Sequence, residues 1–350
     1  MADPARKDGA MDYRSTGVDL DSAERTKDAL KALVDSTRDA HTLSHMGLFG
    51  GLYQVPADLR EPVLVSSADG VGTKLKVAFM TGRHGTVGQD LVNHCVNDIL
   101  VQGARPIFFL DYLATGKLDE DVVPRVVEGM ALACKANGCA LLGGETAQMP
   151  DFYQAGEYDL AGFIVGVVEK AALLDGTRIE AGDRLIALPS SGLHTNGYTL
   201  ARAILFERLG LGVDDALPWD PGTTVADALL AVHRSYLQPL APLLDDGHIR
   251  GLAHITGGGI PGNLPRILPQ GLGAAVDRSS WTVPALFQGL QEAGEVHREE
   301  MYRVFNMGVG MVVAVAASEA ERVLALLEEA GETPWMLGQV TSGSGVVFQG

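Results

Sequence analysis

Short apolar runs typical of strands alternate with longer amphipathic stretches typical of helices between residues 63 and 168. The runs end near residues 65, 113, 142 and 168, and two of the intervening stretches span about 87–102 and 119–137. This alternation predicts a sheet with helices packed on it. A chain of 350 residues, 46% of them hydrophobic, can form two cores. We expect an α/β (α+β) protein with a flexible N-terminal arm at 1–12 and two domains at 13–169 and 170–350.

The net charge of −17 limits the partners of this chain. Nucleic acids and anionic membranes require a basic face that neutralises phosphates, so we expect neither as a partner. A small phosphorylated substrate needs only a few amides, one lysine and a divalent cation, and an acidic protein can supply these within one cleft.

The pattern of the cysteines and the composition of the N-terminus indicate in which cellular compartment the protein works. Cys95, Cys134 and Cys139 lie in apolar patterns without metal-ligand spacing, which predicts buried thiols in a reducing environment. The first eight residues lack the apolar segment of a signal peptide, and no apolar run is long enough to span a bilayer. We expect a cytoplasmic protein.

The segment 66–74 places an acid, glycines, a hydroxyl and a lysine after the apolar run that ends at Val65. Glycines allow backbone N–H groups to approach phosphate oxygens, Asp69 can hold a hard cation, and Lys74 adds a positive charge. The spacing is not that of a Walker loop, and an Asp-Gly pair after a strand also fits an ordinary turn. The candidate nucleotide residues of this segment are Asp69, Gly70, Gly72, Thr73 and Lys74.

The expected helix over 87–102 carries a polar stripe on an otherwise apolar surface: Asp90, His94, Asn97 and Asp98. Carboxylates on a buried helix are costly without a counter-charge, which favours metal ligation by Asp98. The alternative interpretation is that this stripe is the solvated face of the helix.

Two further acids interrupt or follow apolar strands. Asp111 lies inside the expected strand 107–113, and Glu145 follows Gly143 and Gly144 at the end of another. Asp111 is either a ligand or a satisfied hydrogen-bond acceptor. With Asp69 and Asp98, these acids are candidates to converge on magnesium and the phosphates of ATP.

Two loops in the second half offer polar groups to a substrate. The first precedes a helix, where free N–H groups attract anions, and contains Ser191, Gly192, His194, Thr195 and Asn196. The second contains His254, Thr256, Gly257 and Gly258. His194 is a candidate to contact a phosphate or to move a proton, although a histidine in a loop is also ordinary polar surface. The second loop is alternatively a tight turn.

The chain resembles the aminoimidazole ribonucleotide synthetase family, also called phosphoribosylformylglycinamidine cyclo-ligases. The likeness covers nearly the whole chain, and its most specific segments are residues 17–19, 69–74, 95–104, 111–118, 143–147, 192–198, 254–259 and 300–310. No G-x-S-x-G, H-E-x-x-H or strand-linked G-x-G-x-x-G motif supports a hydrolase, zincin or dinucleotide site.

The resemblance implies an enzyme that uses ATP and Mg2+ to cyclise formylglycinamidine ribonucleotide to aminoimidazole ribonucleotide, releasing ADP and phosphate in purine biosynthesis. It implies a homodimer in which N-terminal strands close a barrel at the interface, and a C-terminal substrate domain with a mixed sheet covered by helices. Asp69, Asp98 and Glu145 resemble metal ligands. Lys31 and Lys74 resemble phosphate contacts, and His194, Glu145 and Asp69 are the candidate catalytic residues.

Other activities of the same superfamily remain alternatives for this chain. Selenophosphate synthetase, thiamine monophosphate kinase and the glutamine-dependent amidotransferase of the preceding step resemble the same superfamily. A selenophosphate synthetase is expected to carry a reactive cysteine or selenocysteine in its N-terminal loop, whereas the first cysteine here is Cys95. A non-catalytic nucleotide-binding protein would tolerate loss of the acids, and all four acids are present. The segment 41–51 departs from the family's glycine-rich pattern, which leaves substrate closure in doubt.

Overall fold

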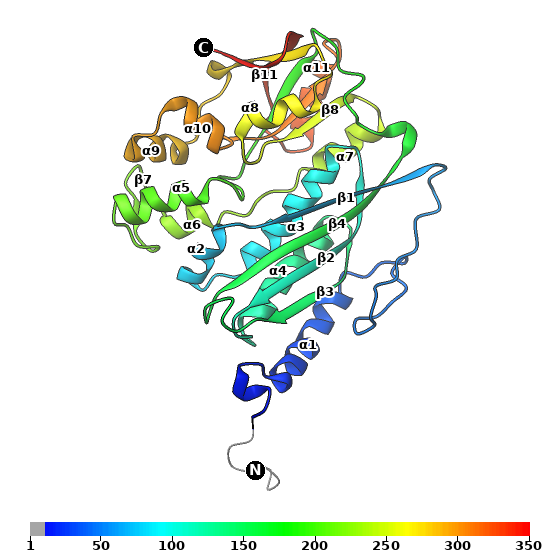
Figure 1. Ribbon diagram of the computed structural model, residues 1–350. Helices are drawn as coiled ribbons and strands as arrows, with labels where there is room; N and C mark the ends of the chain where they lie inside the picture. Colours follow the sequence, from blue (N-terminus) through cyan, green and yellow to red (C-terminus); the bar gives the residue numbers. More distant parts are fainter. Residues whose placement is uncertain (1–10) are drawn as a thin grey trace.

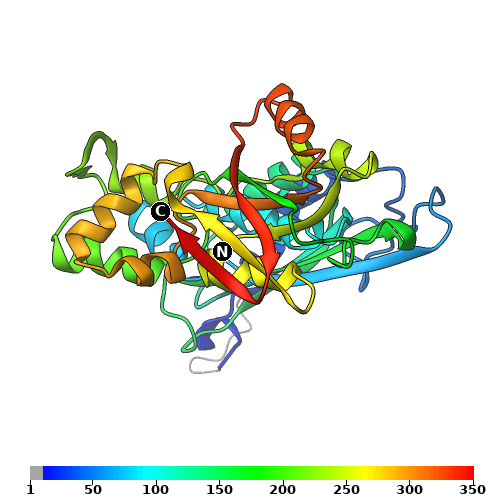
Figure 2. The same cartoon turned by 90° about the horizontal axis from the view of Figure 1, so that it is seen from above.

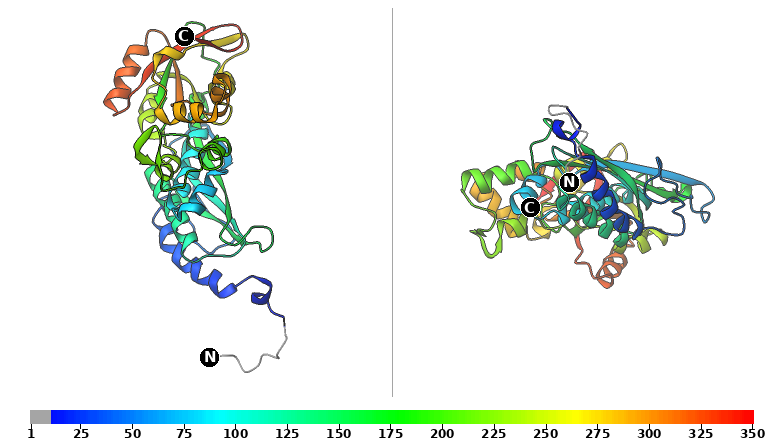
Figure 3. Two further views of the ribbon diagram at one scale, coloured as in Figure 1. Left: turned by 90° about the vertical axis from the view of Figure 1, so that its left-hand side faces the viewer. Right: turned by 90° about the horizontal axis from the view of Figure 1, so that it is seen from below.

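The structure, a computed structural model, describes residues 11–350 and contains two sheets stacked along one long axis (Figures 1 and 3). The predicted N-terminal arm therefore lies mostly outside the described residues. The elements of the first half are α1 (Leu20–Asp35), β1 (Pro62–Gly70), α2 (Lys74–Thr81), α3 (Gly85–Leu100), β2 (Arg105–Thr115), α4 (Val122–Ala136), β3 (Ala140–Gln148) and β4 (Tyr158–Glu169).

The second half contains a larger number of short elements. They are β5 (Arg184–Pro189), α5 (Tyr198–Arg202), the π-helical turn η3 (Ala203–Arg208), β6 (Ala216–Leu217), β7 (Asp220–Thr224), α6 (Val225–Leu229), α7 (Leu237–Asp245), β8 (Ile249–His254), α8 (Gly259–Asn263), η4 (Leu264–Ile267), β9 (Leu272–Asp277), α9 (Ala285–Gly294), α10 (Arg298–Val304), β10 (Val309–Val315), α11 (Ala320–Glu329), β11 (Trp335–Ser342) and β12 (Gly345–Gln349). Within residues 11–350, no helix combines the length and apolar composition needed to cross a bilayer.

The first sheet has the strand order β1-β4-β2-β3, so β1 and β3 form its two edges. Helices α3 and α4 cover one face (Figure 1). Gly162 of β4 permits this contact, because a Cβ there would lie 2.4 Å from the Phe109 ring and 2.9 Å from Leu91 of α3. On the opposite face Leu64 and Phe163 remain 60% and 44% exposed. The sheet is open within one chain, so the predicted barrel has no counterpart in a single chain.

The second sheet has the order β12-β9-β11-β5-β10-β8, and only the β12–β9 pair in it is parallel. Apolar side chains of α7 and α11 pack on one of its faces, and those of α8 and η4 pack on the other. Figure 2 shows α11 projecting on one side of this sheet. The prediction of a mixed C-terminal sheet covered by helices is confirmed.

Helix α3 lies between the two sheets, because it contacts β1, β2 and β4 on one side and α7 and β8 on the other (Figure 1). The polar stripe of α3 faces the second half of the chain. Asp90, His94 and Asn97 are 0%, 3% and 0% exposed. The alternative that this stripe is a solvated face is therefore wrong.

Several predicted elements differ from the observed ones. Strand β1 continues through Gly70, so Asp69 belongs to a strand and only the residues that follow turn into α2. Residues 217–224 have the composition of a loop but form most of the short hairpin β6–β7. Helix α4 begins at Val122 rather than at Asp119, although the Asp119 carboxylate still accepts hydrogen bonds from the N–H groups of Asp121 and Val122.

Gly88 tests the contact between α3 and α4. A Cβ at Gly88 would lie 2.1 Å from the Val126 carbonyl oxygen of α4, whereas a Cβ at Gly85 would meet Arg125 at an ordinary 3.6 Å. We expect Gly88→Ala to lower the free energy of unfolding by about 1–3 kcal/mol or more, because the helices must separate. Gly85→Ala is the matched control and should remain close to wild type. Equal denaturation midpoints for both variants would contradict this packing.

Candidate active site between the two sheets

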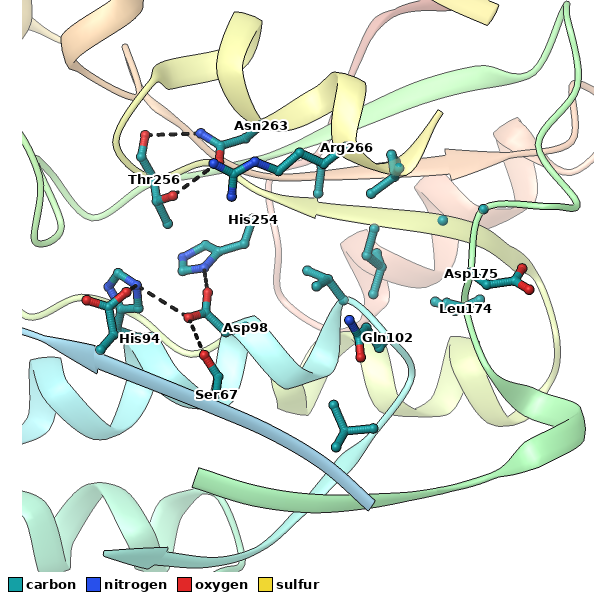
Figure 4. Close-up of a pocket in the computed structure, with 18 of the residues that line it drawn as sticks. Ser67, His94, Asp98, Gln102, Leu174, Asp175, His254, Thr256, Asn263 and Arg266 are labelled. Carbon is teal, nitrogen blue, oxygen red and sulfur yellow. Dashed lines mark hydrogen bonds and ion pairs between the residues drawn. The ribbon is translucent and has the colours of Figure 1, made fainter. Parts of the chain in front are cut away.

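Two histidines and two carboxylates meet where α3 faces β1 and β8 (Figure 4). His94 Nε2 lies 2.8 Å from Asp69 Oδ2 and 3.6 Å from Asp98 Oδ2. His254 Nδ1 lies 2.9 Å from Asp98 Oδ1. The Ser67 hydroxyl donates to the other oxygen of Asp98 at 3.1 Å. The structure thus brings together three residues that the sequence predicted separately, Asp69, Asp98 and His254.

A second layer of side chains fixes the orientation of these histidines. His94 Nδ1 is 2.7 Å from the Thr195 hydroxyl, and His254 Nε2 is 3.0 Å from His233 Nε2. The His233 ring stacks on His194 at 3.9 Å. Sequence reasoning missed His233, because it lies in an irregular segment whose pattern gives no sign that the segment packs on the stripe of α3.

Burial and charge act in opposite directions on these groups. Partial burial raises the pKa of Asp69, but its hydrogen bond with His94 outweighs that effect and lowers the pKa below its usual value. The same balance, with His254 as partner, lowers the pKa of Asp98. Burial lowers the pKa of His94, but its contact with Asp69 raises the pKa above the usual value. Both carboxylates are therefore ionised at neutral pH.

The pKa values of the other histidines shift the opposite way. Burial lowers the pKa of His254 despite its contact with Asp98, and it lowers the pKa values of His194 and His233 much further. Among these four histidines, His94 is therefore the one whose surroundings favour the protonated form.

A cavity of about 460 Å³ opens beside this cluster, between β1 and α3 on one side and β8 and η4 on the other (Figure 4). Arg266 is the only arginine or lysine among its lining residues in the described part of the chain. The polar and charged side chains that line it are Ser66, Ser67, Asp69, His94, Asp98, Gln102, Asp175, His254, Thr256, Asn263 and Arg266. The cavity thus combines anionic groups with one guanidinium, an arrangement suited to a ligand of mixed charge.

Lys74 does not reach this cavity. Its ammonium is fully buried, lies 2.8 Å from Asp90 Oδ2, and donates to the carbonyl oxygens of His194 and Ala231 at 3.1 and 2.7 Å. Three partners occupy its three N–H groups. The prediction that Lys74 contacts a phosphate is corrected, because the side chain instead connects α2 and α3 to the second half of the chain.

Other predicted nucleotide and metal residues lie away from the cluster. Lys31 is exposed on α1, which packs on α4 and β3. Glu145 is exposed on β3, three strand spacings or about 14 Å from β1. Asp69 lies opposite Gly162, which in turn lies opposite Asp111, so these three residues face the same side of the sheet. Glu145 lies opposite Tyr112, the next residue along β2, and therefore faces the other side. Within one chain, therefore, Glu145 cannot share an ion with Asp69 and Asp98.

Asp111 points to the helix-covered face of the first sheet. Its neighbour on β3 is Gly144, whose lack of a side chain leaves room for the Asp111 carboxylate. Burial raises the pKa of Asp111 to about 7, and the charge of Glu145 adds to this shift. It does not line the cavity. The other candidate nucleotide residues of the segment 66–74, Gly70, Gly72 and Thr73, are exposed or half-buried. They lie near α5, where the hydroxyls of Thr73 and Thr199 are 3.1 Å apart.

The two predicted substrate loops adjoin each other, since a Cβ at Gly257 would lie 2.9 Å from Asn196 Oδ1. In the first loop, His194 and Thr195 are buried next to the other histidines of the site. The Ser191 hydroxyl donates a hydrogen bond to the Val232 carbonyl oxygen. His194 Nε2 accepts a hydrogen bond from the Ser191 N–H, so His194 is neither polar surface nor part of the cavity wall.

The remaining residues of these loops lie nearer to the cavity. Thr256 lines it and donates to Asn263, while Gly192, Gly257 and Gly258 shape the loops. Gly258 adopts φ +97, a value that favours glycine.

Comparison with known proteins identifies the family. A family model described as "AIR synthase related protein, N-terminal domain" matches residues 55–168, and its C-terminal counterpart matches residues 180–350. The phosphoribosylformylglycinamidine cyclo-ligases of Trichlorobacter lovleyi and Sorangium cellulosum are each 53% identical to this chain. The first alignment covers 95% of both chains, and the second covers 97% of this chain and 98% of the relative. The chain belongs to the phosphoribosylformylglycinamidine cyclo-ligase family.

Solved structures share the fold of this cyclo-ligase family member. Thiamine-monophosphate kinase from Stenotrophomonas maltophilia superposes with a TM-score of 0.69 at 19% identity, covering 93% of this chain and 96% of the kinase. Hydrogenase maturation protein HypE in complex with ATP gives 0.66 at 21% identity, covering 90% and 88%. At these identities the likeness shows the fold alone.

Replacement of Lys74 distinguishes a structural role from a phosphate contact. We expect Lys74→Met to lower the free energy of unfolding by about 3–5 kcal/mol without any ligand, because the variant leaves the Asp90 carboxylate buried without a counter-charge. Lys76→Met, on the same helix but with a side chain 43% exposed, is the control and should change stability little. A Lys74→Met variant as stable as wild type would contradict the structural role.

Asp111 predicts a pH dependence of stability. Its pKa of about 7 in the folded state exceeds the unfolded value of 3.8, so the folded state binds the proton more tightly. The linkage sign is that stability falls as pH rises from about 4 to about 7. We expect Asp111→Asn to remove this decrease and to gain up to about 4 kcal/mol relative to wild type above pH 7. Denaturant titrations at pH 5 and pH 8 measure this difference, and an equal offset at both would contradict it.

Proposed function

We propose that this chain closes the imidazole ring of aminoimidazole ribonucleotide from formylglycinamidine ribonucleotide, with consumption of ATP and release of ADP and phosphate. The observation that carries this proposal is the 53% identity over nearly the full length with two relatives named phosphoribosylformylglycinamidine cyclo-ligase. The chain is thus an enzyme that forms a C–N bond. The fold neighbours at 19–21% identity carry no comparable weight for a kinase or a maturation factor.

The chemistry requires activation of an amide. The formyl oxygen of the substrate is a poor leaving group until the γ-phosphoryl group of ATP is transferred to it, which releases ADP. The amidine nitrogen then attacks the activated carbon, a C–N bond forms, the C–O bond breaks, and phosphate leaves. Binding the two reactants side by side in one cavity supplies the proximity that this sequence of steps needs.

The charges around the cavity support this assignment. Asp69 and Asp98 are ionised and suit a hard cation bound to a triphosphate, and Mg2+ at such a site neutralises charge on the phosphates. Arg266 presents the planar donor fork that suits the phosphate of a sugar phosphate. Thr256 and Asn263 add neutral polar groups between these charged groups. We assign the nucleotide to the carboxylate side and the ribose phosphate to the side of Arg266.

We expect the uncovered face of the first sheet to be buried in a dimer. Leu64 and Phe163 expose large apolar surfaces there, and Leu48 and Phe49 of the preceding loop are 64% and 116% exposed. Large exposed apolar side chains of this kind are typical of an interface. We propose that a second copy of this chain covers it, as the family resemblance implies. A cytoplasmic location fits the three free, buried thiols.

The activity is tested with purified protein. We expect ADP and phosphate to form only when formylglycinamidine ribonucleotide, ATP and Mg2+ are present together. Asp98→Asn should lower kcat/KM by about 100-fold or more, because the site loses a carboxylate that supports phosphoryl transfer. His248→Gln, outside the cavity, is the control and should retain full activity. Equal ADP release without the ribonucleotide, or turnover of thiamine monophosphate, would contradict the proposal.

A further inference from the structure

We propose that Asp69, His94, Asp98 and His254 form a binding site for a first-row transition-metal dication, which this site prefers over Mg2+. The inference rests on the same two carboxylates as the proposed function and refines the identity of the ion that they hold. Ligand atoms of His94, Asp98 and His254 lie within 4.8 Å of one another, and the Asp69 carboxylate is 2.8 Å from His94. Small contractions would bring these atoms to the spacing of a coordination sphere.

The backbone places these ligands on rigid elements. His94 and Asp98 are four residues apart on α3 and therefore share one helix face. Asp69 lies near the end of β1, and His254 is the last residue of β8. All four line the cavity, and the Asp69 side chain is 44% exposed, which leaves an entry path for an ion.

Each ligand is oriented by a partner on its other side, as metal ligands commonly are. His94 uses Nδ1 to contact Thr195 and keeps Nε2 toward the carboxylates. His254 contacts His233 through Nε2 and keeps Nδ1 toward Asp98.

The carboxylates are supported in the same way, since Ser67 donates to Asp98 and the Gly70 N–H donates to Asp69. In the present arrangement, His94 Nε2 and His254 Nδ1 contact the carboxylates directly, and these are the nitrogens that would bind a dication.

The donor set decides which ion fits. Mg2+ prefers an all-oxygen octahedron and retains several waters, whereas imidazole nitrogen suits Mn2+, Fe2+, Co2+ and Zn2+ increasingly well. Two nitrogens beside two carboxylates therefore favour a transition metal. A neighbouring trio, His194, His233 and His254, also lies within 4.8 Å but is a poorer site. The His194 and His233 rings are stacked at 14°, so their lone pairs do not converge on one point.

Manganese binding to the full-length protein tests this site. After chelation of adventitious metal, Mn2+ is titrated and the free ion is followed by its electron paramagnetic resonance signal. We expect one Mn2+ per chain, displaced by Mg2+ only at an excess of at least about tenfold. Pulsed resonance of the bound ion should show modulation by imidazole nitrogen. Absence of stoichiometric binding, or bound Mn2+ without nitrogen modulation, would overturn the inference.

Two variants locate the ion. His94→Gln should weaken Mn2+ binding by at least about tenfold and reduce the nitrogen modulation, while Mg2+ affinity stays within about threefold. His254→Gln is the second variant if His94→Gln does not fold. His248→Gln, which also pairs with a carboxylate, is the matched control and should bind Mn2+ as wild type does. Unchanged Mn2+ binding in the folded variants would refute the assignment to these residues.

The outcome separates this inference from the proposed function. If no Mn2+ site exists while substrate-dependent ADP release with Mg2+ persists, the transition-metal inference fails and the ring-closing activity stands. If Mn2+ binds as expected but no ADP forms with formylglycinamidine ribonucleotide, the activity fails and the metal site stands.

Discussion

The buried ion pair between Lys74 and Asp90 is the interaction on which the arrangement of the two halves depends. Both side chains are 0% exposed, and removing either charge would leave the other without compensation in a medium of low dielectric constant. Burial lowers the pKa of Lys74 and raises the pKa of Asp90, and the attraction between the two charges opposes both shifts. Because Lys74 also donates to carbonyl groups of the second half, this pair fixes how α3 meets that half.

The rest of the polar stripe on α3 follows from the same constraint. Polar groups that enter an interface must find partners, and here Asn97 accepts from the N–H of Tyr236 while His94 and Asp98 pair with groups of β1, β8 and the loop after β5. His94 and Asp98 therefore both satisfy part of this interface and line the cavity, whereas Asn97 serves the interface alone. The packing of the two halves against α3 therefore also determines where the side chains of the site lie.

Sequence patterns predicted the elements with strong periodicity. The predicted helix over 87–102 corresponds to α3, and the predicted strand over 107–113 lies within β2, because apolar periodicity reports directly which residues meet a core. The same patterns selected Asp69, Asp98 and His254, which the structure brings together beside one cavity. They failed for Lys74 and Glu145, since burial against a distant segment and the order of strands in a sheet are long-range properties. His233 was missed for the same reason.

A structure of the protein with formylglycinamidine ribonucleotide and a non-hydrolysable ATP analogue tests the central claim most directly. That claim is that the chemistry takes place in the cavity between the two sheets, bordered by α3, β1, β8 and η4. The account predicts that the triphosphate lies beside Asp69 and Asp98 and that the sugar phosphate contacts Arg266. Ligands bound outside this cavity, with neither carboxylate nor Arg266 in contact, would contradict it.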